Sequence, residues 1–163
     1  MKLLGAGLLL CTGLLAGCAA ARRLEQQVQL LRLLRQMLTA MMQTLQATLP
    51  LTADLLQMLA DTPAFAELRF LQVAAGNPEN YPQCWLDAVR HDPALTKDTA
   101  AVMETVGQTL GSTALDGQLA ALQLCLDRLG ALQTDAENAA AKHCGLCRSM
   151  GILSALFLAI LLL

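Results

Sequence analysis

The residues best suited to chemistry lie near the end of the chain, where Cys144 and Cys147 form a CxxC pair directly preceded by His143. This spacing suits thiolate metal binding or disulfide exchange. A zinc site needs a second pair of ligands, and the sequence has no second CxxC. A thioredoxin-like motif belongs in an α/β setting, whereas this chain is rich in helix formers. We therefore interpret both thiols as incidental and reduced, and keep His143, Cys144 and Cys147 only as weak metal candidates; a redox enzyme is the rival interpretation.

A second cysteine motif lies at the other end of the chain. Leu15-Ala16-Gly17-Cys18 has the form of the lipobox of bacterial lipoproteins, in which Cys18 would be lipidated and the following residues exported. Arg22 and Arg23 follow this apolar run directly, and positive charge at that place resists translocation. An uncleaved anchor is therefore favoured, with a lipoprotein lipidated at Cys18 and carrying an exported helical domain as the alternative.

Other patterns that support catalysis are missing from the sequence. The glycines are not followed by the Lys-Ser/Thr of a phosphate-binding loop, and His91 has no convincing serine or cysteine partner. The acidic residues are spread along the chain as a solvated surface would require. A net charge of −2 gives no basic excess for nucleic acid. We predict no enzyme activity, no cofactor and no nucleic-acid binding.

The composition indicates that helices must position these residues. Hydrophobic residues make up 55% of the chain but aromatic residues only 3%, so the apolar fraction is mainly Leu, Ala and Met. These are good helix formers, and the β-branched and aromatic residues typical of strands are scarce. The fold class predicted is all-α.

The excess hydrophobicity is concentrated at the two ends. Residues 3–21 carry no charge, and a helix of that length spans about 28 Å, close to the thickness of the bilayer's hydrocarbon core. A second apolar run, residues 150–163, spans about 21 Å and can insert if the bilayer thins locally. We predict an N-terminal transmembrane anchor at 1–21, a helical domain at 22–149 and a short C-terminal transmembrane helix at 150–163.

Charge placement predicts the topology of these segments. Residues 22–49 carry four arginines against one glutamate, whereas residues 50–141 carry four basic residues against twelve acids. Lys142 and Arg148 then precede the second apolar run. Both basic stems face the central domain, so the positive-inside rule predicts that this domain is cytoplasmic.

The central domain is predicted to be a bundle, giving about six helices for the chain. A long helix with a wide apolar stripe, in which Arg35 occupies one slot, ends at Pro50, and Thr52 is expected to cap the next helix. Pro and Gly punctuation separates the later helices. The predicted ranges are 22–49, 52–60, 62–76, 81–91, 97–110 and a last helix from about 116.

The order of several motifs resembles the stage III sporulation protein AB family over nearly the whole chain. The residues that carry the resemblance are Ala21-Arg22-Arg23-Leu24, Leu31-Arg32, Pro50-Leu51, Trp85 with Ala88, Gly107-Gln108-Thr109-Leu110-Gly111 and Gln118. Two acids that the family often has are replaced here, one by Ala114 and one by Gln43 and Thr44. The interaction candidates that the resemblance implies are Trp85, Gly107, Leu110, Gly111 and Gln118.

The resemblance implies a fold like the cytoplasmic domains of the type II secretion F protein. It also implies a non-enzymatic platform of the channel complex between mother cell and forespore, in the membrane around the forespore. The expected partners are the membrane, the AAA-type ATPase (stage III sporulation protein AA) and other channel proteins, and a homo-oligomer is left open. Residues 111–117 are expected to form a turn. Gly107 and Gly111 stand four apart and are expected to share one helix face, serving packing before partner contact, and Trp85 is expected to anchor the core. Reversing the charges of Asp87, Asp92 and Asp98 is predicted to weaken ATPase recruitment.

Overall fold

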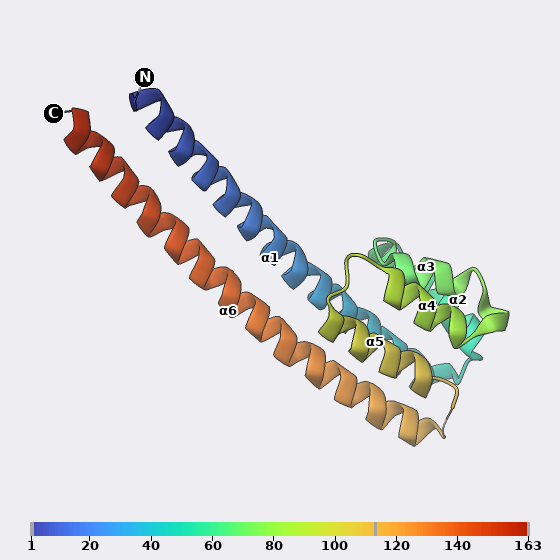
Figure 1. Cartoon of the computed structure of the whole chain (residues 1–163). Helices are drawn as coiled ribbons and strands as arrows, with labels where there is room; N and C mark the ends of the chain where they lie inside the picture. The colour runs from blue at the N-terminus through green and yellow to red at the C-terminus, as the bar shows by residue number, and fades with distance from the viewer. Residues whose placement is uncertain (1, 113, 163) are drawn as a thin grey trace. The chain divides into compact units, whose positions relative to one another are not determined.

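The computed structural model of the chain consists of helices joined by short loops (Figure 1). It describes the backbone of residues 2–112 and 114–162 and the side chains of residues 22–112 and 114–142. Within these residues there are six α-helices, two short 3-10 helices and no strand, which confirms the all-α prediction. The elements are α1 (Lys2–Thr48), α2 (Thr52–Ala60), η1 (Pro63–Phe65), α3 (Arg69–Ala75), η2 (Pro78–Asn80), α4 (Gln83–His91), α5 (Lys97–Thr109) and α6 (Leu115–Leu162).

Membrane anchoring remains a prediction from the sequence. Among the residues that the structure describes, no helix is both long enough and apolar enough to cross a membrane. The predicted anchors, residues 1–21 and 150–163, lie outside the residues whose side chains are described.

The chain divides into two compact units. One unit combines Met1–Gln29 with Thr134–Leu163, the N-terminal part of α1 and the C-terminal part of α6. The other unit is Leu30–Gln133, which holds the rest of both long helices together with α2 to α5. All the sites described below lie in this second unit.

The core of the Leu30–Gln133 unit is built from apolar faces of every α-helix. Helix α3 packs on α2 and on α4, and α4 packs on α5. The wide stripe predicted on the long helix is largely buried, which explains how α1 can contribute to so large an interior. Side chains less than 2% exposed include Leu31, Leu34, Met37, Leu38, Met41, Leu55, Leu56, Phe70, Leu71, Trp85 and Met103.

The turn after α1 differs from the prediction in two respects. Leu49, the last residue of the helix predicted at 22–49, is 64% exposed and has a φ of 46°. Pro50 follows Leu49, and a proline disfavours helical geometry in the preceding residue, so α1 ends at Thr48. The predicted cap at Thr52 is also wrong, because Thr52 is the first residue of α2 and Leu51 at the N-cap makes no side-chain hydrogen bond.

The helix predicted at 62–76 is in fact two short elements, η1 and α3. Leu68 between them has extended backbone geometry, with φ −81° and ψ 91°. In one continuous helix Phe65 and Phe70 would point about 140° apart, because each residue adds about 100°. Both phenylalanines are buried, so the break lets each of them reach the core.

Candidate functional site

Trp85, the single tryptophan of the chain, lies at the centre of the contact between α4 and α5. Its side chain is 0% exposed, and its indole Nε1 donates a hydrogen bond to the carbonyl oxygen of Met103 at 2.7 Å. The rings of Phe70 and Tyr81 pack edge-on against it, with centroids 5.2 and 6.5 Å away. The indole is therefore held by one polar contact and two aromatic contacts, and it is a core residue.

Gly107 on α5 provides the surface on which this indole rests. A Cβ atom at this position would lie 2.2 Å from Trp85 Cδ1 and 2.7 Å from Nε1, far inside van der Waals contact. The hydroxyl of Tyr81 donates to the carbonyl oxygen of Gly107 at 2.7 Å. Glycine is needed here because the ring occupies the space of a side chain, which lets α4 and α5 approach closely.

Gly111 and Gln118 shape the turn between α5 and α6. The expectation that Gly107 and Gly111 share a helix face is wrong, because α5 ends at Thr109 and Gly111 lies in the turn with φ +76°. This left-handed geometry favours glycine. The Gly111 amide donates to Gln118 Oε1 at 3.3 Å, and Leu110 is only 4% exposed. Both Leu110 and Gln118 thus take part in closing this corner of the bundle.

The displaced pKa values in this unit have structural causes. Burial, followed by the nearby Cys84, raises the pKa of Tyr81. Burial likewise raises the pKa of the Cys125 thiol. On the surface Arg90 Nε donates to Glu104 Oε1 at 2.8 Å, and this hydrogen bond lowers the pKa of Glu104 and raises that of Arg90. Packing or a surface ion pair accounts for each shift, so none of these groups is singled out as a catalytic acid or base.

Several sequence candidates are not brought together. Among the described side chains there is no group of three or more His, Cys, Asp or Glu residues that could hold a metal ion. His91 is exposed, with Nδ1 2.8 Å from the carbonyl oxygen of Asp87. The weak metal candidates and the lipidation candidate lie outside the described side chains and remain predictions: His143, Cys144, Cys147 and Cys18.

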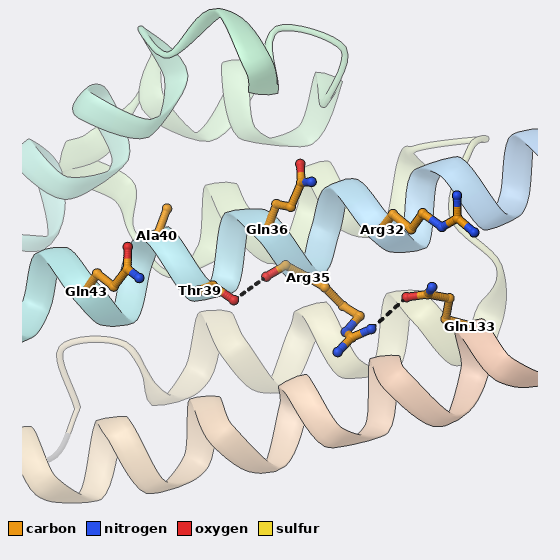
Figure 2. Close-up of a pocket in the computed structure, with 7 residues that line it drawn as sticks. All are labelled: Arg32, Arg35, Gln36, Thr39, Ala40, Gln43 and Gln133. Atoms are coloured by element: carbon orange, nitrogen blue, oxygen red, sulfur yellow. Dashed lines mark hydrogen bonds between the residues drawn. The ribbon is translucent and has the colours of Figure 1, made fainter.

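A polar groove between α1 and α6 is the site that the sequence analysis missed (Figure 2). Its volume is about 420 Å³, and it is lined by Arg32, Arg35, Gln36, Thr39, Ala40, Gln43 and Gln133. Arg35 Nη1 donates to Gln133 Oε1 at 2.9 Å, as Figure 2 shows. Arg35 Nε is buried and has no acceptor among the described residues. The sequence held one indication of this groove. Arg35 interrupts an otherwise apolar stripe, and a cation at such a position needs polar neighbours.

The fold and these sites define a class of protein: an all-α bundle whose most distinctive residues serve helix packing. A tryptophan seated on a glycine joins α4 to α5, and a glycine turn joins α5 to α6.

The comparisons with known proteins identify the family within that class. The chain belongs to the stage III sporulation protein AB family, whose model matches residues 2–163. A solved structure of stage III sporulation protein AB has a similar fold, with a TM-score of 0.56 and 19% sequence identity over 71% of this chain and 97% of that chain. No curated protein matches the chain in sequence. Family membership confirms the resemblance found in the sequence and assigns the chain a role in sporulation, and hence a spore-forming bacterium as its source.

Proposed function

We propose that the chain is a non-enzymatic, membrane-anchored assembly component of the channel complex between mother cell and forespore. It links the cytosolic AAA-type ATPase, stage III sporulation protein AA, to other channel proteins in the mother-cell membrane that surrounds the forespore. The observation that carries this proposal is the family match over residues 2–163. The described residues support it by forming an all-α bundle.

In this proposal both ends of the chain are membrane anchors, and residues 22–149 face the cytoplasm. The apolar runs at 1–21 and 150–163 and the basic residues beside them support this arrangement. A double tether keeps the domain at a high effective concentration near its partners. We expect the full-length protein to stay in the membrane fraction after alkaline carbonate extraction, and Cys84 to be shielded from an impermeant thiol reagent in intact cells. Labelling of Cys84 in intact cells would contradict the cytoplasmic orientation.

The ATPase-binding surface is proposed to include exposed acids of α4 and α5. Asp87 is exposed and, with Glu79, lines a depression of about 540 Å³. Asp98 is exposed in the first turn of α5. Asp92 is unsuitable for a charge-reversal test, because its Oδ1 accepts a hydrogen bond from the amide of Ala94 at 2.9 Å and so shapes the loop.

The test combines Asp87→Lys with Asp98→Lys and measures recovery of the ATPase by pull-down on the full-length protein. The matched control combines Asp54→Lys with Asp127→Lys. Asp54 lies in the first turn of α2, just as Asp98 lies in the first turn of α5. Both control residues are exposed. We expect about tenfold lower recovery for the test variant, because its new lysines would repel the basic partner surface that the acids attract. The control should show wild-type recovery. Unchanged recovery with a folded test variant would contradict the proposed surface.

The alternative function, a lipoprotein with an exported domain, rests on the lipobox form of the residues that end at Cys18. The intact mass of the membrane-extracted protein separates the two. We expect the full N-terminus, whereas a lipidated chain that begins at Cys18 would establish the alternative.

A further inference from the structure

An open depression between α3 and α4 exposes an almost entirely apolar surface. Its volume is about 420 Å³, and its apolar lining comes from both helices and the loop after α4, with Phe70, Val73, Ala88 and Pro93 among its residues. Val73 is 53% exposed, so the depression is reached directly from solvent. The site is therefore an accessible apolar surface with room for one bulky side chain.

The packing of the two helices gives this depression two different ends. Cys84 Sγ, near the start of α4, lies 3.9 Å from the carbonyl oxygen of Ala74, near the end of α3. The two helices therefore run in opposite directions at this contact. Val73 lies beside the first turns of α4, whereas Arg69, at the start of α3, lies toward the C-terminal end of α4.

The apolar depression adjoins the acidic one that Glu79 and Asp87 line. Cys84 and Asp87 belong to the linings of both. Together the two linings carry three acids, Glu79, Asp87 and Asp92, against one arginine, Arg69. Because Arg69 lies at the far end from Val73, the negative charge is strongest beside Asp87. A basic side chain of another protein is favoured at that end.

The acids by themselves do not explain a stable complex. An ion pair between exposed side chains contributes little binding free energy, because both charges stay hydrated. Most of the binding free energy of an interface comes from a few apolar or aromatic side chains that fill pockets near its centre, with charged residues around them. The depression beside Asp87 has this arrangement, an apolar pocket bordered by charge.

We propose that the depression between α3 and α4 receives one bulky apolar side chain of the ATPase, and that a Lys or Arg close to that side chain pairs with Asp87. This inference rests on the proposed function, because it takes the ATPase as the partner. It adds the apolar anchor that a surface of exposed acids lacks.

The variant Val73→Asp distinguishes an apolar anchor from a surface that binds by charge alone. If charge alone mattered, a further acid at position 73 would strengthen the binding of a basic segment. If an apolar side chain is buried there, the new carboxylate loses its hydration against that side chain, and binding weakens. Met58→Asp is the matched control, because Met58 on α2 is 54% exposed and Val73 is 53% exposed.

The experiment measures recovery of the ATPase by pull-down on the full-length protein, with the fold of each variant checked by Trp85 fluorescence. We expect about tenfold lower recovery for Val73→Asp and wild-type recovery for Met58→Asp, because only position 73 borders the anchor. In a second measurement, a photo-crosslinking amino acid at position 73 should form an adduct with the ATPase, at a segment that holds a Lys or Arg. The same amino acid at position 58 should form none.

The outcomes separate this inference from the proposed function. If the wild type recovers the ATPase and folded Val73→Asp recovers as much or more, the anchor is refuted and the proposed function stands. An adduct from position 73 only to phospholipid or to a second copy of the chain has the same meaning. If the wild type recovers no ATPase, the proposed function fails, and this inference fails with it.

Discussion

Two glycines within helices, Gly107 and Gly130, should respond in opposite ways to the same substitution by alanine. Alanine raises helix propensity by about 1 kcal/mol at an interior helical position, so this gain is shared by both sites. A Cβ atom at Gly130 would meet its nearest atom, Arg35 Cζ, at 3.9 Å, which is ordinary contact. At Gly107 the nearest atom would be Trp85 Cδ1 at 2.2 Å. The difference between the two variants therefore measures the packing of the tryptophan on the glycine.

The magnitude at Gly107 follows from what holds the indole in place. Carbon atoms in contact lie about 3.5–4.0 Å apart, so the ring must retreat by about 1.5 Å. Its Nε1 is bonded to the Met103 carbonyl at 2.7 Å, and Phe70 packs on it with a centroid distance of 5.2 Å. Overpacking costs about 1–3 kcal/mol, and a broken buried hydrogen bond costs about 1–3 kcal/mol more. After the gain in helix propensity, we expect Gly107→Ala to lower the free energy of unfolding by about 3 kcal/mol and Gly130→Ala to raise it by up to about 1 kcal/mol.

Urea unfolding of the full-length protein, followed by the fluorescence of its single tryptophan, measures both changes. The Gly107→Ala spectrum should also shift to longer wavelength if water reaches the displaced indole. A double-mutant cycle with Trp85→Phe, with unfolding monitored by far-UV circular dichroism, tests the contact directly. In the Trp85→Phe background, Gly107→Ala should lower the free energy of unfolding by at least about 1 kcal/mol less than in the wild type, because the shorter ring lacks the Nε1 edge. Equal stability of the Gly107→Ala and Gly130→Ala variants would refute this packing account.

Three further substitutions test the same region by urea unfolding. Tyr81→Phe removes the hydrogen bond to the Gly107 carbonyl and should cost about 0.5–1.5 kcal/mol. Burial raises the pKa of Tyr81 above its ordinary 10.0, so the phenol ionises at lower pH in the unfolded chain than in the folded one. The free energy of unfolding of the wild type should therefore fall as the pH rises past 10.0, and that of Tyr81→Phe should fall less. Equal pH dependence of the two proteins would contradict this. Thr96→Ala removes the N-cap of α5, where the Thr96 side chain accepts a hydrogen bond from the Thr99 amide. It should lower the free energy of unfolding by about 1 kcal/mol, and unchanged stability would contradict a role for this cap. Gly111→Ala places a side chain at φ +76° and a Cβ 2.9 Å from Thr52 Oγ1, and should cost about 1–2 kcal/mol; a neutral result would show that the turn relaxes freely.

The helices were largely predictable because their limits are local signals. The sequence placed α2 at 52–60 and α5 from 97, and the structure has Thr52–Ala60 and Lys97–Thr109. Prolines, glycines and short polar residues act within a few positions of their own place in the chain. The apolar stripe of the long helix likewise follows from helical periodicity alone. The split of the predicted 62–76 helix was missed, because it arises from the need to bury two phenylalanines in one distant core.

The candidate site was only partly predictable, since its defining contacts join residues distant in the sequence. Trp85 and Gly107 were both singled out, but not their contact across 22 positions, which depends on how α4 crosses α5. The place of Arg35 in an apolar stripe was visible, whereas its bond to Gln133, 98 positions away, depends on α1 lying beside α6.

The sequence by itself therefore determined the all-α class, most helix limits, the family and the concentration of apolar residues at the two ends. These properties depend on residue type and on spacing along the chain. Only the tertiary structure decided why Gly107 must be glycine and that Arg35 lines a groove in which it bonds to Gln133. Each of these depends on which side chains meet in space, and helical periodicity specifies the face of a helix but not its neighbour.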